Sequence, residues 1–103
     1  MAEAVASLPY DVYSREEAAD FVKGKPFSFL NIDRPETGFA AGYDMYADEV
    51  YDHAAKLYAD WKKEGIFVQE DTPCYYVYEL TMDGRSQTGI VGTAAVSDYE
   101  NGV

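Results

Sequence analysis

Three short groups of polar residues carry the side chains that could bind a small metabolite. They are Tyr10 and Asp11, Arg34 and Glu36, and Gln87 and Thr88. The first group precedes a predicted helix, whose N-terminus favours anions, and the second follows a predicted strand, where sites of α/β proteins tend to form. The third lies on a predicted strand, where neighbouring residues point to opposite faces. For each group the alternative is an ordinary loop or turn without a ligand.

No motif of a common catalytic or cofactor site is present. The sequence has no Walker A loop, no G-x-G-x-x-G after a strand, no H-E-x-x-H and no C-x-x-C. The segment from Gly89 to Gly92 superficially resembles a phosphate loop, but its spacing is wrong and a hairpin accounts for both glycines. We therefore predict no metal ion and no cofactor for these residues, and no catalytic residue is assigned.

Three other polar features are expected to be structural or solvated. Cys74 is the only cysteine, which excludes an intramolecular disulfide, and we expect it to be a small buried hydrophobe. His53 is the only histidine and lies on the polar face of a predicted helix, where we expect it to be solvated. The acidic residues at positions 48, 49 and 52 share that convex face and are expected to be solvated rather than to hold a cation.

The charge of the chain limits its partners. Nineteen acidic against eight basic residues give a formal net charge of −11. Nucleic acids and anionic membrane surfaces select basic patches, so we expect neither as a partner. No apolar run approaches the roughly 18 residues that span a bilayer, and the start of the chain lacks the basic segment of a secretory signal. We expect a cytoplasmic protein.

Two helices are predicted. Ser14 to Glu17 is a capping box, which places the first helix over residues 15–23, and Gly24 should end it. The second helix is expected over residues 46–64, because apolar residues recur there at spacings of three and four. These apolar residues form a stripe that should be buried: Ala47, Val50, Tyr51, Ala54, Leu57, Tyr58 and Trp61.

The strands are expected in two places. Weak alternation predicts a strand over residues 27–32, followed by a loop over residues 33–42 that is long enough to suggest a function. Further on, Asp83-Gly84 between two β-type runs predicts a hairpin with a two-residue type I′ turn. Its strands are expected over residues 75–81 and 86–96, at the centre of a sheet.

The turn fixes which residues of the hairpin face one another. Met82 should face Arg85, so that Tyr78 faces Gly89 and Tyr75 faces Gly92. A glycine in a strand packs nothing, and an aromatic ring lying across it restores the contact. The register therefore predicts that a tyrosine ring covers each strand glycine.

Together these elements predict an α+β fold: a small mixed, mostly antiparallel sheet with two helices packed on one face. A chain of 103 residues is expected to form a single domain with one core. Trp61 should be buried where the second helix meets the sheet.

Five ordered motifs resemble those of the bacterial DUF1015 family, over residues 9–102. They are P-Y-D-V-x-S-x-x-E-A at 9–18, P-x-S-F-L-x-x-x-R-P-E at 26–36, V-Y-x-x-A at 50–54, Q-T-G at 87–89 and D-Y-x-x-G at 98–102. Members of the family are longer and continue into a basic stretch of the form I-K-K-H-E. The resemblance therefore implies that this chain is the N-terminal part of a longer protein.

The resemblance also implies a chemistry, because the family is similar to ParB-like free-serine kinases. It implies phosphoryl transfer or hydrolysis on serine-like metabolites, with nucleotide and Mg²⁺ in the longer protein. Asp11 and Glu36 would orient a hydroxyl group and Arg34 would clamp a phosphate or carboxylate. Residues 1–103 on their own, without the rest of the longer protein, should be inactive. The alternative is a non-catalytic binding or assembly module, since a tyrosine-rich edge strand invites pairing with another chain, including a second copy.

Overall fold

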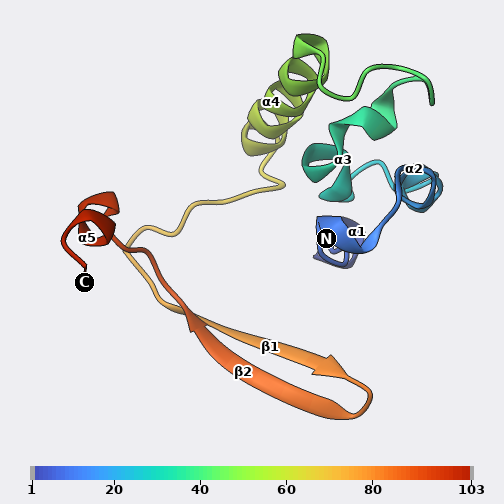
Figure 1. The fold of residues 1–103 in the computed structure, drawn as a ribbon. Helices are drawn as coiled ribbons and strands as arrows, with labels where there is room; N and C mark the ends of the chain where they lie inside the picture. The colour runs from blue at the N-terminus through green and yellow to red at the C-terminus, as the bar shows by residue number, and fades with distance from the viewer. Residues whose placement is uncertain (1, 103) are drawn as a thin grey trace. The chain divides into compact units, whose positions relative to one another are not determined.

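The computed structural model describes residues 2–102, and the chain divides into two compact units. Unit 1, Met1–Val68, contains α1 (Ala2–Val5), the 3-10 helix η1 (Tyr10–Val12), α2 (Arg15–Val22), α3 (Leu30–Asp33), the 3-10 helix η2 (Pro35–Gly38) and α4 (Asp48–Lys63). Unit 2, Gln69–Val103, contains the strands β1 (Tyr76–Met82) and β2 (Arg85–Val91) and the helix α5 (Val96–Glu100) (Figure 1). The predicted α+β class is confirmed. No helix among residues 2–102 is long and apolar enough to cross a membrane.

Helix α2 begins at the predicted capping box. The Ser14 hydroxyl accepts a hydrogen bond from the Glu17 amide at 3.1 Å, and the Glu17 carboxylate accepts one from the Ser14 amide at 3.3 Å. These two bonds satisfy amides that a helix N-terminus leaves unpaired. The helix ends at Val22, and Gly24 follows with a positive φ of 70°.

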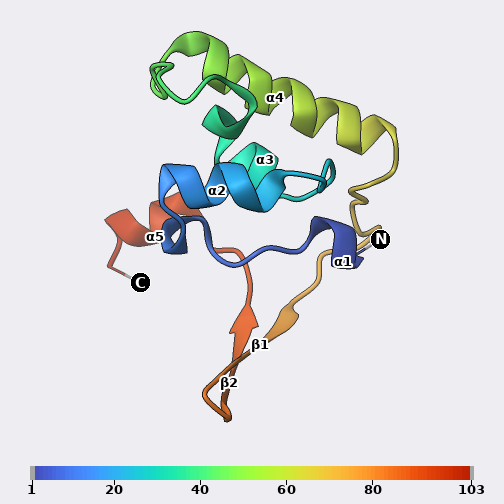
Figure 2. The same ribbon diagram turned by 90° about the vertical axis from the view of Figure 1, so that its right-hand side faces the viewer.

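The core of unit 1 lies between α4 and the segments that precede it. Both views place α3 between α4 and α2 (Figures 1 and 2). The buried apolar residues are Ala18, Leu30, Val50 and Trp61. The predicted burial of Trp61 is confirmed, and its ring packs against Phe27 and Phe67 at centroid distances of 6.0 and 5.6 Å. Both partners belong to unit 1, so the expected sheet partner is not needed for this burial.

The buried stripe of α4 is narrower than the sequence predicts. The sequence predicts Tyr51 and Tyr58 in the core, but they are 54% and 47% exposed. The Tyr58 ring still contacts Phe67, and the Lys62 ammonium lies 4.7 Å from the centre of the Tyr58 ring. Tyrosine tolerates such a half-exposed position because its ring is apolar and its hydroxyl is polar.

The predicted strand over residues 27–32 is wrong, because this segment forms a turn followed by α3. Leu30 is fully buried and donates its amide to the Ser28 hydroxyl at 3.3 Å. The Asn31 side chain donates to the carbonyls of Lys25 and Ser28 at 3.1 and 3.0 Å. Ser and Asn side chains that bond the nearby backbone stabilise turns over strands. The weak alternation comes instead from aromatic residues that pack on α4 and the segment after it.

The expectation that His53 is solvated is also wrong. Its ring is half-buried and packs edge-on against Phe39 at a centroid distance of 5.4 Å. A Cβ atom added to Gly38 would lie 2.8 Å from the imidazole Nε2, so a larger residue at this position would have to displace the ring. The ring therefore lies against η2, which occupies part of the loop predicted over residues 33–42.

The hairpin has the predicted register. Met82 pairs with Arg85, and the turn residues Asp83 and Gly84 have φ values of 54° and 77°. The described sheet has only these two antiparallel strands, so each strand is an edge rather than the predicted centre. The second strand ends at Val91, earlier than expected.

Only one of the two predicted ring-over-glycine contacts is present. A Cβ on Gly92 would lie 2.9 Å from the Tyr75 ring, as predicted. No atom of the described chain lies within 4 Å of the corresponding position at Gly89, although Tyr78 pairs with it. The hairpin therefore has a gap at Gly89.

Replacing Gly84 with Val should destabilise the hairpin by about 1–3 kcal/mol, because a β-branched residue resists a positive φ. Thermal unfolding followed by circular dichroism and by the hairpin amide resonances measures the effect. The matched control is Gly42→Val, a loop glycine with nothing within 4 Å of its Cβ position and no positive φ. An equal loss in both variants would show that the turn conformation is not the cause.

Candidate functional site

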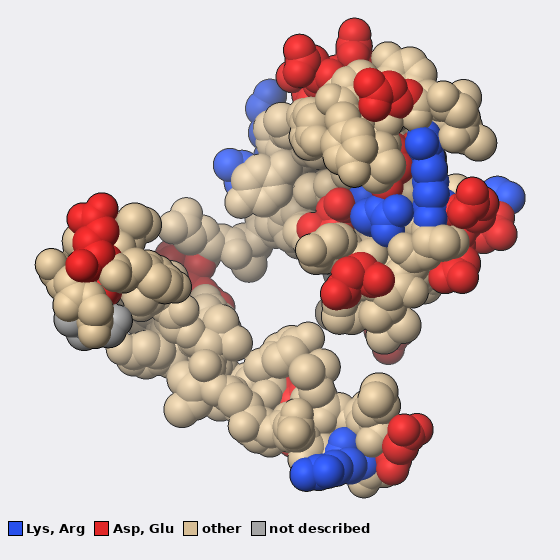
Figure 3. Space-filling view, viewed as in Figure 1, with Lys and Arg blue, Asp and Glu red and all other residues tan. Residues whose placement is uncertain are grey.

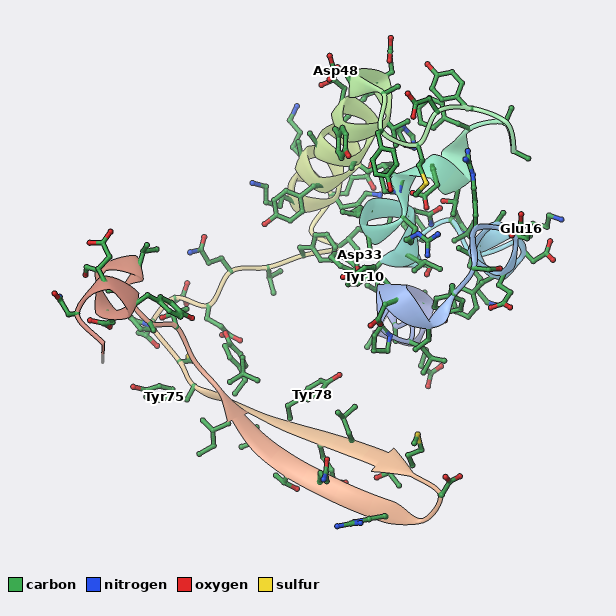
Figure 4. The ribbon with its side chains drawn as sticks, viewed as in Figure 1. Tyr10, Glu16, Asp33, Asp48, Tyr75 and Tyr78 are labelled. Atoms are coloured by element: carbon green, nitrogen blue, oxygen red, sulfur yellow. The ribbon has the colours of Figure 1, made fainter. Side chains whose placement is uncertain are left out.

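The structure brings four of the predicted site residues together in one pocket of unit 1. Tyr10, Asp11, Arg34 and Glu36 line this pocket, whose volume is about 420 Å³. Its other walls are Tyr13, Asp33, Pro35, Met45, Tyr46 and Tyr51. Figure 4 shows Tyr10 and Asp33 next to each other on unit 1. Residues from η1, α3, η2 and α4 therefore meet at this pocket.

Arg34 is the centre of the pocket. Its Nε donates to the Glu36 carboxylate at 2.5 Å, and its Nη1 donates to the carbonyls of Tyr10 and Tyr13 at 3.1 and 2.8 Å. The side chains of Arg34 and Glu36 are only 14% and 4% exposed. A guanidinium with this many fixed bonds keeps one orientation, and the bonds tie η1 to η2.

One nitrogen of Arg34 remains available to a ligand. Among residues 2–102, no protein group bonds the Arg34 Nη2 atom, and no buried side-chain nitrogen or oxygen lacks a partner. Nη2 therefore reaches solvent, and Arg34 lines the pocket. By the same argument, the second oxygen of Glu36 is open to solvent. Arg34 and Glu36 both line the pocket, and each keeps one polar atom that is in contact with solvent and has no protein partner among residues 2–102.

The pocket is acidic as a whole. Asp11, Asp33 and Glu36 line it together with a single basic residue, Arg34. Figure 3 shows basic atoms on this face of unit 1 with acidic atoms around them. Asp33 is exposed overall, but partial desolvation of its carboxyl raises the pKa of that group above its usual 3.8. A free polyanion would be repelled by these carboxylates, whereas a ligand with both an anionic and a cationic group matches them.

The raised pKa of Asp33 predicts a pH dependence. The folded state holds the proton of the Asp33 carboxyl more tightly than the unfolded chain does. The contribution of Asp33 to the free energy of unfolding therefore falls as pH rises from 3.8 through the folded-state pKa. Asp33→Asn should therefore gain stability relative to the native chain as pH rises through that window. Urea unfolding at several pH values measures the difference, with Asp52→Asn at an exposed position of α4 as the control. A constant difference between Asp33→Asn and the native chain would contradict the shift.

Sequence reasoning missed most of the wall residues of the pocket. Asp33 directly precedes Arg34, and this adjacency was the available signal. The spacing of apolar residues along α4 predicts that Tyr51 lies in the core, but Tyr51 is exposed and lines the pocket. Met45 and Tyr46 come from the loop before α4, and no pattern in the sequence indicates their position.

Gln87 and Thr88 do not line the unit 1 pocket. They belong to β2, where both border a shallow hollow of about 510 Å³ on the hairpin. In the observed register Gln87 pairs with Leu80 and Thr88 with Glu79, so their side chains point to opposite faces, as predicted.

The other polar features form no metal-binding group among the described residues. In residues 2–102, no three His, Cys, Asp or Glu side chains are grouped so that they could hold a metal ion. Cys74 is exposed rather than buried as predicted, and its thiol donates to the Thr72 carbonyl at 3.1 Å.

Comparison with known proteins gives one match. The family described as "Protein of unknown function (DUF1015)" matches residues 1–103. No curated protein and no solved structure matches the chain. Because the family match covers the whole sequence, the chain belongs to the DUF1015 family.

Proposed function

We propose that unit 1 binds a small serine-like metabolite in the Arg34 pocket, as part of a cytoplasmic enzyme that transfers or hydrolyses a phosphoryl group. In this proposal the chain is the N-terminal part of that enzyme. The observation that carries the proposal is the fixed Arg34–Glu36 pair, which leaves the guanidinium Nη2 and one carboxylate oxygen open to the pocket. Family membership is compatible with this role but assigns no activity.

A zwitterionic hydroxy amino acid matches the charges of the pocket. Its carboxylate would accept a hydrogen bond from Arg34, and charge-assisted bonds of this kind are the strong ones. Its ammonium group would lie near Asp11 and Asp33, whose carboxylates border the same pocket. The open oxygen of Glu36 would then accept the hydroxyl proton and orient that oxygen, the role a carboxylate has in phosphoryl transfer.

A nucleotide and Mg²⁺ belong to the same proposal, but the described residues do not form a site for the metal. No group of three potential ligands exists among residues 2–102, and the pocket carboxylates do not form such a group. Other parts of the enzyme or the nucleotide itself would have to hold the ion. The role of this chain is therefore to bind and orient the acceptor.

Isothermal titration calorimetry with L-serine, O-phosphoserine, and ADP or ATP with Mg²⁺ tests the proposal. We expect L-serine to bind, and Asp11→Asn to weaken it about tenfold, the value of one charge-assisted hydrogen bond. Asp11 is exposed and makes no hydrogen bond that the fold needs, so the variant should stay folded. Asp52→Asn, an equivalent change at an exposed position of α4 outside the pocket, should bind normally. Absence of serine binding, or equal weakening by both variants, would refute the proposal.

A second candidate is a non-catalytic binding or assembly module. The observation that favours it lies in unit 2, where every residue of both hairpin strands is exposed. In this case calorimetry would give no heat with any metabolite, and the activity of the chain would lie in its contacts with another protein.

A further inference from the structure

The two faces of the hairpin differ in composition. We define the tyrosine face as Tyr76, Tyr78, Leu80 and Met82 of β1 with Arg85, Gln87, Gly89 and Val91 of β2, because these residues pair in the observed register. The opposite face carries Val77, Glu79, Thr81, Ser86, Thr88 and Ile90. On that face the hydroxyls of Thr81 and Ser86 bond each other at 2.7 Å. The tyrosine face has no acidic residue, although the chain has a net charge of −11.

A two-stranded hairpin with an uncovered apolar face is only marginally stable in water. On the tyrosine face, Tyr78 and Leu80 are each 53% exposed, and the gap at Gly89 leaves a hollow beside them. We propose that the tyrosine faces of two copies of this chain pack on each other across a two-fold axis, which forms a four-stranded sandwich. This inference is independent of the Arg34 pocket.

The charges of unit 2 favour a second copy in this arrangement. Arg85 is the only basic residue among residues 69–103, and it pairs with Met82 at the turn end of the tyrosine face. Glu70 and Asp71 line a pocket together with Tyr76, at the open end of the hairpin. When the two-fold axis is perpendicular to the strands, the turn end of one hairpin lies against the open end of the other. Each Arg85 then meets the acidic pair of the second copy, so the interface contains two complementary charge contacts.

The shape and area of the face are also consistent with a self-complementary contact. Tyr78, Leu80 and Gly89 lie in the middle of the strands, so the two-fold axis passes near them. The Tyr78 ring of each copy can enter the hollow at Gly89 of the other. Large side chains bury about 150–250 Å² each, so the half-exposed face offers on the order of 500 Å² per copy. A pair then buries about 1,000 Å², the lower limit for a specific interface, which predicts a weak dimer.

Sedimentation velocity over a concentration series tests the dimer, with matched variants on the two faces. Leu80→Asp puts a charge on the tyrosine face and should weaken dimerisation by at least about tenfold. Val77→Asp makes the same change on the opposite face of the same strand and should leave the dimer intact. Amide resonances of the hairpin verify that both variants keep the register.

The charge contact gives a second test that leaves the apolar residues of the tyrosine face unchanged. Arg85→Glu should weaken the dimer, and adding Glu70→Arg should restore it, because the pair is then reversed. A native chain that stays monomeric at millimolar concentration would overturn the proposal. Equal effects of Leu80→Asp and Val77→Asp, or no restoration by the reversed pair, would overturn it as well.

Discussion

Replacing Trp61 with Ala is expected to lower the free energy of unfolding of unit 1 by about 3–5 kcal/mol. The ring is 4% exposed and packs between Phe27 and Phe67, so its removal leaves a cavity that these rings cannot close. Phe67 also packs on Phe29 and Tyr58, so the loss extends through the aromatic cluster. A small domain has about 5–15 kcal/mol of stability in total, and the variant should approach the limit of folding.

Chemical denaturation followed by tyrosine fluorescence and far-ultraviolet circular dichroism measures this change. The matched control is Tyr51→Ala on the same helix, which removes an aromatic ring that is 54% exposed. We expect the control to lose less than about a third of the Trp61 effect, because its ring buries less area. Similar losses in the two variants would mean that Trp61 is not the centre of the core.

Replacing Arg34 with Met should cost about 3–5 kcal/mol, the typical loss when one partner of a buried ion pair is removed. The substitution removes the bonds to the carbonyls of Tyr10 and Tyr13 and leaves the buried carboxylate of Glu36 without its cation. Both the connection between η1 and η2 and the charge balance are lost. Urea unfolding at neutral pH measures the loss.

A double-mutant cycle with Glu36→Gln separates these two contributions. When the carboxylate is already neutral, Arg34→Met should cost clearly less, because no buried charge is left unpaired. The loss of unfolding free energy that remains in this background measures the hydrogen bonds from Arg34 to the carbonyls of Tyr10 and Tyr13. Strict additivity of Arg34→Met and Glu36→Gln would show that the two side chains are not coupled, which would contradict the ion pair at the centre of the pocket.

The parts of the fold that the sequence predicts are those determined by local chemistry. Asp83 and Gly84 both adopt positive φ, so the turn, and with it the register of the hairpin, follows from two residues. Ser14 and Glu17 bond each other's amides, so the start of α2 follows from a four-residue pattern. The long helix α4 was predicted from its spacing alone, within two residues at its start.

The parts that were predicted wrongly depend on contacts between distant residues or on competing local bonds. Residues 27–32 alternate like a strand, but the Ser28 and Asn31 side chains bond the local backbone and form a turn. His53 lies on a polar helix face, yet Phe39 and Gly38 cover it. The pocket could be predicted only in part, because its residues become neighbours through the bonds of Arg34 to segments more than twenty positions away.

An amide-resonance titration of the ¹⁵N-labelled chain with L-serine tests the binding pocket most directly. We expect the shifted resonances to be those of residues 10–13 and 33–36 and of the start of α4, which border the Arg34 pocket. The side-chain Nε resonance of Arg34 should shift with them, because its guanidinium contacts the ligand. Shifts confined to the hairpin, or no shifts at millimolar serine, would show that the Arg34 pocket does not bind serine.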